Sequence, residues 1–276
     1  MEYKIIVDSS SNMTKDLIID PEVGFDVAPL KVIVDGTEYV DDGKVDVKEM
    51  LDKVMDSKSK SSSSCPSPND YLERLTGADK YIIITLSEKL SGSYNSACLA
   101  KNLYSKPENV FVIDSKLVAG TMELMANKAY ELIKAKKTFD DIQKELTDYR
   151  NNMNLLFILS HFDVFIKNGR INKIIGFIAT KLHIKPVLFG SDGEIKIKDK
   201  CRTIKKAILK LVSDIGEFAK STANKACIIS HTFAKDEALV VKQKIEEQYE
   251  FKSVTIRENN ALCSYYAMPG GLIVCF

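Results

Sequence analysis

The chain of 276 residues is 45% hydrophobic and 28% charged, and its 39 basic and 38 acidic residues give a net charge of +1. This balance excludes the basic surface that is typical of nucleic-acid-binding proteins, so we expect no nucleic acid among its partners. No apolar run reaches the roughly 18 to 20 residues that a membrane-spanning helix needs. The polar start of the chain is not typical of a signal peptide.

The length of the chain predicts two domains rather than a single core. Its six cysteines are scattered, with no CxxC pair and no histidine at the spacing of metal ligands. Several of them lie in apolar segments, where cysteine behaves as a small hydrophobic residue. We therefore expect a reduced, cytoplasmic protein without a metal site or a cofactor.

Strands and helices alternate in the first half of the chain. Runs of β-branched and aromatic residues predict strands at 3–7, 27–34, 81–86 and 109–113, with a turn at Asp35-Gly36 into 38–40. Apolar residues at helical spacing predict helices at 15–19, 47–55, 68–75, 121–135 and 139–150, and one that begins at 94. The Ser-rich segment 58–68 is interpreted as a linker, which Pro66 and Pro68 stiffen. The alternation favours a parallel sheet covered by helices.

The second half mixes hairpins with helices from about residue 153. Strands are predicted at 155–160, 183–189, 194–197, 226–230, 252–257 and 271–276, and helices at 203–218 and 237–249, while 174–182 is apolar at most positions. A hairpin turn is predicted at Ser191-Asp192-Gly193. The fold class is thus α/β, with a mainly parallel N-terminal α/β domain over 1–152, a C-terminal α+β domain over 153–276, and the ligand between them.

The stretch from Tyr81 to Ala97 (YIIITLSEKLSGSYNSA) is the most informative part of the sequence. A buried strand runs into a turn rich in small hydroxyl residues, and a helix follows. Free backbone N–H groups at the start of a helix attract negative charge, so this turn predicts an anion site. The alternative is that Ser91 or Ser93 only caps the helix.

Several signatures of enzymes are absent from the sequence. There is no GxSxG elbow, no GxxxxGK[ST] loop and no GxGxxG motif. Of the three histidines, His183 lies in an apolar strand and is interpreted as a core residue, whereas His161 and His231 follow strands. The residues alone therefore favour an anion-binding protein over a catalyst.

Several short motifs follow one another along the chain. They are Asp8-Ser9-Ser10, Ala28-Pro29-Leu30-Lys31-Val32, Ser63-Ser64-Cys65-Pro66-Ser67, Leu90-Ser91-Gly92-Ser93-Tyr94-Asn95-Ser96-Ala97, Asn168-Gly169-Arg170-Ile171, Ile184-Lys185-Pro186-Val187-Leu188 and Cys201-Arg202-Thr203. In this order they resemble the motifs of the DegV family of bacterial fatty-acid-binding proteins. The resemblance covers essentially the whole sequence.

The resemblance implies a two-domain carrier that encloses one long-chain fatty acid and has no catalytic activity of its own. It implies that Ser63, with Ser62 or Ser64 as neighbours, and Ser91 hold the carboxylate. Proteins of this kind present the acid to a separate dihydroxyacetone-kinase-like fatty acid kinase, which forms an acyl phosphate for phospholipid synthesis. The same role leaves room for transient contact with a membrane.

The basic residues of two motifs, Arg170 and Arg202, are candidates for binding the head group or for docking the kinase, and the sequence does not separate these roles. The family's C-terminal motif carries a histidine near the carboxylate, where this chain has Tyr266. A phenol donates a hydrogen bond but carries no positive charge near neutral pH. Tyr266 is therefore a candidate for binding the carboxylate through a hydrogen bond rather than through charge.

Two other functions compete with the carrier hypothesis. The first is a serine-dependent hydrolase of acyl esters that uses Ser91 with His231. The second is a regulatory or structural module in which a lipid only fills the core.

Overall fold

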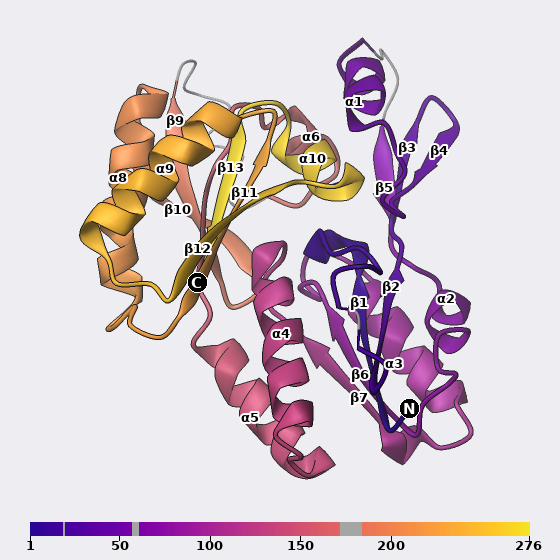
Figure 1. Cartoon of the computed structure of the whole chain (residues 1–276). Helices are drawn as coiled ribbons and strands as arrows, with labels where there is room; N and C mark the ends of the chain where they lie inside the picture. Colours follow the sequence, from indigo (N-terminus) through magenta and orange to yellow (C-terminus); the bar gives the residue numbers. More distant parts are fainter. Residues whose placement is uncertain (19, 57–60, 172–183) are drawn as a thin grey trace.

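The computed structural model describes residues 1–18, 20–56, 61–171 and 184–276 and contains three sheets (Figure 1). The first is fully parallel, with strand order β2-β1-β6-β7. Its strands are β1 (Tyr3–Asp8), β2 (Val23–Ala28), β6 (Lys80–Thr85) and β7 (Val110–Asp114). Helices that accompany it are α2 (Pro68–Leu72), α3 (Ser93–Leu103), α4 (Gly120–Lys134) and α5 (Phe139–Asn151).

Alternate side chains of β1 and β6 point to opposite faces of this sheet, as the pleat requires. Ile6 and Ile83 pack with residues of α2 and α3, whereas Ile5 and Ile82 pack with residues of α4 and α5. Both faces are therefore covered, which explains why these strands are apolar throughout rather than alternating.

The second sheet has six strands in the order β10-β9-β8-β13-β11-β12. Of its neighbouring strands, β11 and β12 pair in parallel and the other pairs are antiparallel. Its strands are β8 (Leu155–Ile158), β9 (Lys185–Ser191), β10 (Glu194–Cys201), β11 (Ala226–Thr232), β12 (Ser253–Glu258) and β13 (Gly271–Cys275). Figure 1 shows α8 (Ile204–Phe218) and α9 (Lys235–Gln248) on the outer face of this sheet and α4 between it and the parallel sheet.

A small antiparallel sheet, β4-β3-β5, stands above the parallel sheet in Figure 1. It comprises β3 (Lys31–Val34), β4 (Thr37–Val40) and β5 (Ser62–Ser64), with α1 (Val47–Asp56) beside it. The remaining described helices are α6 (Asp163–Lys167), α10 (Ala261–Ala267) and the short 3-10 turns η1 (Ser9–Ser11) and η2 (Pro107–Asn109).

The predicted α/β class, with a parallel sheet and a separate mixed sheet, is confirmed, whereas the domain boundary at 152/153 stays a prediction. Two helices were missed, α6 and α10. Helix α10 comes late in the sequence, yet its Ala261, Leu262 and Tyr265 join the core that also contains Ile5 and Ile82. The C-terminal part of the chain therefore contributes to packing around the parallel sheet.

Three local predictions were wrong. The predicted helix at 15–19 is a turn over residues 15–16, and residue 19 lies outside the described residues. The predicted strand 27–34 is two strands, because Pro29 lacks an N–H and the N–H of Leu30 donates to Ser9 Oγ at 2.9 Å. The predicted linker contains β5, which pairs with β3. The predictions on 174–182 and His183 lie outside the described residues.

The buried carboxylate of Asp8 connects the ends of three elements. Its Oδ1 accepts hydrogen bonds from Ser10 N at 3.2 Å and Ser10 Oγ at 2.5 Å. Its Oδ2 accepts from Leu86 N at 2.8 Å, just after β6, and from Ser93 Oγ at 2.7 Å, the first residue of α3. Burial raises the pKa of Asp8, while these four hydrogen bonds oppose that rise.

We predict that Asp8→Asn lowers the free energy of unfolding by about 1–3 kcal/mol, because an amide NH2 would face donors where an oxygen now accepts. Urea denaturation monitored by circular dichroism measures this change. The exposed Asp79 provides the control, since Asp79→Asn should shift the midpoint very little. Equal midpoints for the two variants would show that the Asp8 carboxylate does not hold these elements together.

Candidate functional site

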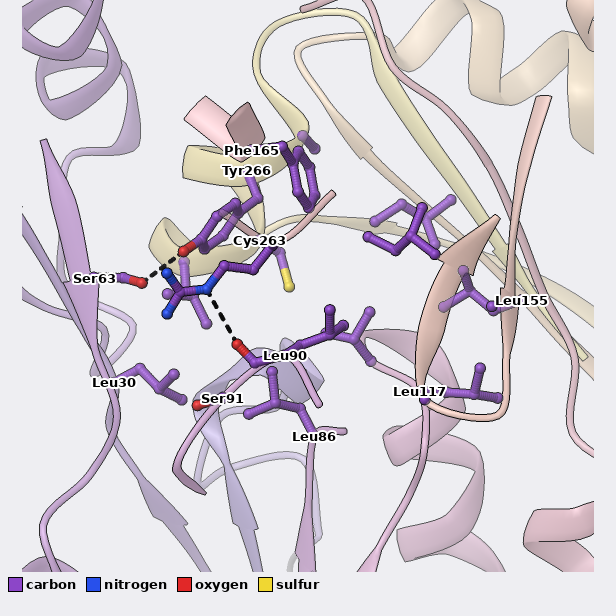
Figure 2. Close-up of a pocket in the computed structure, with 18 of the residues that line it drawn as sticks. Leu30, Ser63, Leu86, Leu90, Ser91, Leu117, Leu155, Phe165, Cys263 and Tyr266 are labelled. Carbon is purple, nitrogen blue, oxygen red and sulfur yellow. Dashed lines mark hydrogen bonds between the residues drawn. The ribbon is translucent and has the colours of Figure 1, made fainter. Parts of the chain in front are cut away.

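A cavity of about 290 Å³ lies between the carboxyl edge of the parallel sheet, the small sheet and the mixed sheet. Its walls are mostly apolar, and Figure 2 shows leucine side chains on several of its sides. The apolar lining comprises Leu30, Leu86, Leu90, Leu117, Val118, Leu155, Phe157, Leu159, Phe165, Ile195, Leu262, Ala267 and Ile273. A long, flexible apolar ligand suits such a lining.

Polar groups gather at one end of this cavity. Ser63 Oγ and Tyr266 Oη form a hydrogen bond of 2.8 Å, and Ser64, Ser91 and Arg170 also line the cavity. Figure 2 shows Ser63, Tyr266 and Ser91 together at the end opposite Leu117 and Leu155. The cavity therefore has one end with hydroxyl donors and a guanidinium, while its other walls are mostly apolar and also include Lys116 and Glu194.

The loop after β6 presents Ser91 at the polar end. The N–H of Ser91 donates to Ser87 O at 3.1 Å, and Ser91 Oγ accepts from Ser93 N at 3.3 Å. Gly92, rather than Ser91 or Ser93, is the N-cap residue of α3, and no side chain of the N-cap residue bonds to this helix. A hydroxyl that accepts one hydrogen bond still has its proton to donate to a ligand.

Two backbone carbonyls fix Arg170. Its Nε donates to Leu90 O at 3.2 Å, and its Nη1 donates to Asn168 O. The side chain of Asn168 in turn donates to Tyr265 Oη at 3.0 Å, and Tyr265 Oη donates to Ser61 Oγ at 2.9 Å. These contacts join the loop after α6, helix α10 and the start of β5 around the polar end.

Helix α10 carries Tyr266 and is held at its first residue by a buried carboxylate. Asp41 Oδ1 accepts from Ala261 N at 2.9 Å, and the carboxyl is 2% exposed. Burial raises the pKa of Asp41 to about 6. Tyr266 itself packs against Phe165, with ring centroids 4.9 Å apart. The position of the Tyr266 hydroxyl therefore depends on contacts from both halves of the chain.

Comparison with known proteins gives a single family. The model of a family described as "Uncharacterised protein, DegV family" matches residues 2–276. The chain belongs to the DegV family. A DegV domain-containing protein from Streptococcus gordonii is 33% identical over 280 residues, which is 99% of this chain and 98% of that protein.

Solved structures of DegV proteins share the fold over the full length. A DegV protein from Ruminococcus gnavus with vaccenic acid is 32% identical, with a TM-score of 0.93 over 100% of this chain and 99% of that one. The Fatty Acid Kinase (Fak) B3 protein of Streptococcus pneumoniae, loaded with linoleic acid, is 30% identical with the same TM-score and coverage. A DegV protein from Eubacterium eligens, loaded with heptadecanoic acid, is 28% identical with a TM-score of 0.90 over 99% of this chain and 98% of that one.

The fold brings together most, but not all, of the candidate site residues that the DegV motifs suggested. Ser63, Ser64, Ser91, Tyr266 and Arg170 all line the cavity. Ser62 lies on β5 beside Ser63 but is not among the described lining residues, and Arg202 is exposed at the end of β10, away from that lining. The roles of these residues stay predictions.

The hydrolase alternative finds no support in this arrangement. His231 lines a different hollow, together with Phe233 and Glu258, whereas Ser91 lines the cavity. Its Nδ1 faces the N–H of Ala234 at 3.5 Å, and burial lowers its pKa. Among the described contacts no hydrogen bond joins His231 to Ser91, so the expected pairing of nucleophile and base is not formed.

Two structural absences also bear on the site. Within residues 1–18, 20–56, 61–171 and 184–276, no group of three or more His, Cys, Asp or Glu side chains could hold a metal ion. No helix in the described part of the chain is long and apolar enough to cross a bilayer.

Some residues that shape the polar end were not identified from the sequence. Asp41 follows β4 and belongs to no motif. Tyr265 and Asn168 form a hydrogen bond although nearly a hundred positions of the chain separate them. Asp41 is a buried loop residue, which gives no periodic signal, and Tyr265 of α10 contacts Asn168 from a distant part of the sequence, so only the fold could reveal these contacts.

We predict that acidification stabilises the DegV chain relative to its Asp41→Asn variant. The pKa of Asp41 is raised in the folded state, so its contribution is fully present below the unfolded pKa near 4 and is lost as pH rises through about 6. The difference in unfolding free energy between the two proteins should change by about 3 kcal/mol over that window, since one pKa unit corresponds to about 1.4 kcal/mol.

Urea titrations of both proteins at several pH values measure this difference. Other titrating groups are common to both chains and cancel in the comparison. Parallel stability curves would mean that Asp41 titrates alike in the folded and unfolded chains.

Proposed function

We propose that this chain binds one long-chain fatty acid in the cavity, with the carboxylate at the polar end, and presents that carboxylate to a separate fatty acid kinase. The observation that carries the proposal is the polarity of the cavity itself. Hydroxyls and a guanidinium stand at one end, and mostly apolar side chains line the rest, with Lys116 and Glu194 among them. The fatty acids bound by the DegV proteins of R. gnavus, S. pneumoniae and E. eligens support the same ligand class.

The energetics of burial support a lipid ligand. Burying a tail of about sixteen carbons at ~0.8 kcal/mol per methylene gives roughly 11 kcal/mol. Association and ordering costs of several kcal/mol come off that total, and micromolar affinity needs only about 8 kcal/mol. The tail thus provides most of the affinity, while the polar end fixes which way the acid lies.

Each polar residue has a distinct role in the proposed complex. Ser63 and Ser91 donate hydrogen bonds to the carboxylate, with Ser64 beside them. Tyr266, already bonded to Ser63, keeps that hydroxyl oriented. Arg170 contributes the positive charge, and exposed Arg202 contributes a docking contact for the kinase.

In this proposal the chain is a carrier in the cytoplasm, and the transfer of a phosphoryl group to the carboxylate belongs to a dihydroxyacetone-kinase-like partner. The name of the S. pneumoniae relative, a fatty acid kinase B3 protein, supports such a partner. All six cysteines are free thiols, which agrees with a reducing compartment.

We expect Ser91→Ala to weaken fatty-acid binding about tenfold or more, because a hydrogen bond to a charged group contributes roughly 1.5–3 kcal/mol. Displacement of a fluorescent fatty acid by oleate measures the affinity. Ser62→Ala is the matched control, since it removes a serine hydroxyl next to the site but outside the described lining. If Ser91→Ala binds oleate as tightly as the control, the carboxylate does not lie at Ser91.

The kinase step predicts that Arg170 and Arg202 differ in their effects. Arg170→Gln should weaken fatty-acid affinity, since the guanidinium lines the cavity. Arg202→Ala should leave that affinity unchanged and lower the rate of acyl phosphate formation by the kinase, which trapping with hydroxylamine detects. A loaded wild-type chain that supports no acyl phosphate with any such kinase would favour a structural role for the lipid.

A further inference from the structure

The apolar end of the cavity is built by two segments that are far apart in sequence. One is the loop before α4, which contributes Leu117, and the other is the β9–β10 hairpin, which contributes Gly190. Figure 2 shows Leu117 and Leu155 at the end opposite the Ser63–Tyr266 pair. In the proposed complex this is where the methyl terminus of the acyl chain would lie.

Hydrogen bonds hold both the carbonyl and the N–H of Leu117. Its carbonyl accepts from Ser87 N at 2.9 Å and from Ser115 Oγ at 3.0 Å, and its N–H donates to Ser115 Oγ at 3.2 Å. The side chain, 7% exposed, therefore projects from a rigid support. Changes in its position must come from its own rotamer rather than from a moving loop.

The hairpin is tied to the same support. Ser87 Oγ donates to Gly193 O at 2.7 Å, and Lys116 Nζ forms an ion pair with Asp192 at the hairpin tip at 2.8 Å. Both contacts involve residues next to those that hold Leu117. The hairpin and Leu117 consequently form one wall, whose two parts cannot move apart without breaking these bonds.

Gly190 lets Leu117 lie directly on the hairpin backbone. A Cβ at position 190 would stand 2.4 Å from Leu117 Cδ2, which is far inside van der Waals contact, and 3.9 Å from Leu155 Cβ. With any larger residue at 190, the flexible end of Leu117 would have to shift. Because Leu117 and Gly190 both line the cavity, the added methyl and the displaced leucine would take up space there.

We propose that Leu117, seated on Gly190, sets the longest acyl chain that the cavity accepts. This inference rests on the proposed function, which it extends from fatty acids in general to a limit on their length. Each methylene that the wall excludes should lower affinity about fourfold, so the limit is sharp enough to measure.

The test compares affinities for saturated fatty acids from about 12 to about 20 carbons, measured by native mass spectrometry of competing mixtures. Leu117→Ala should move the preferred length up by about two to three methylenes, because it removes that much side chain from the wall. Gly190→Ala and Leu117→Phe should both move it down. Leu30→Ala, which shortens a leucine near Ser91 at the other end, is the matched control and should leave the preferred length unchanged.

The outcomes separate the two proposals. Opposite shifts from Leu117→Ala and Leu117→Phe, with no shift in the control, support the length limit, and a thermal melt of each variant verifies that it is folded. An unchanged preference in every folded variant that still binds overturns the length limit and leaves the carrier function intact. A wild-type chain that takes up no fatty acid of any length overturns the carrier function, and the length limit with it.

Discussion

The site depends first on the buried carboxylate of Asp8. Four donors converge on its two oxygens, from η1, from the end of β6 and from the start of α3. Removing a carboxylate from water is unfavourable unless its lone pairs are satisfied, so these donors must stay where they are for Asp8 to remain buried. The loop between Leu86 and Ser93 carries Ser91, and Asp8 holds both of its ends. Its hydrogen bonds therefore determine where the Ser91 hydroxyl points.

A second group of polar contacts joins the segments that form the cavity walls. Asp41 binds the first turn of α10, and Asn12 binds Asn259 and the N–H of Asn260. Glu123 of α4 accepts two hydrogen bonds from Arg257 of β12. Apolar packing alone tolerates small displacements of one layer over another, whereas these contacts have defined geometry. The cavity keeps its shape because its apolar walls are anchored at polar points outside the lining.

The sequence was sufficient for the parts of the molecule whose signal is local. The apolar runs of β1 and β6 predicted a parallel sheet, which the structure contains. The anion site that the hydroxyl-rich turn at Ser91 predicted at the carboxyl edge of this sheet stays a prediction. Tertiary contacts decided the rest. The serines of β5 form a strand only because β3 offers a free edge, and α10 joins a core built mainly by the other half of the chain. Contacts between residues 97 to 220 positions apart leave no periodic pattern, so the Asn168–Tyr265–Ser61 contacts and the anchoring by Asp41 could not be foreseen.

The replacement of the family's histidine by Tyr266 changes the electrostatics of the polar end. A phenol can bond to Ser63 but supplies no charge near neutral pH, so in the proposed complex the charge for the carboxylate comes from Arg170, which also lines the cavity. A guanidinium has five N–H donors, and Arg170 uses Nε and one Nη1 proton on the carbonyls of Leu90 and Asn168. The remaining three donors suffice for a carboxylate, so one residue can be anchored to the protein and still bind the ligand. Because arginine side chains in proteins are always protonated whereas histidine titrates near neutral pH, the proposed complex should hold its ligand with little dependence on pH, unlike one that relies on histidine.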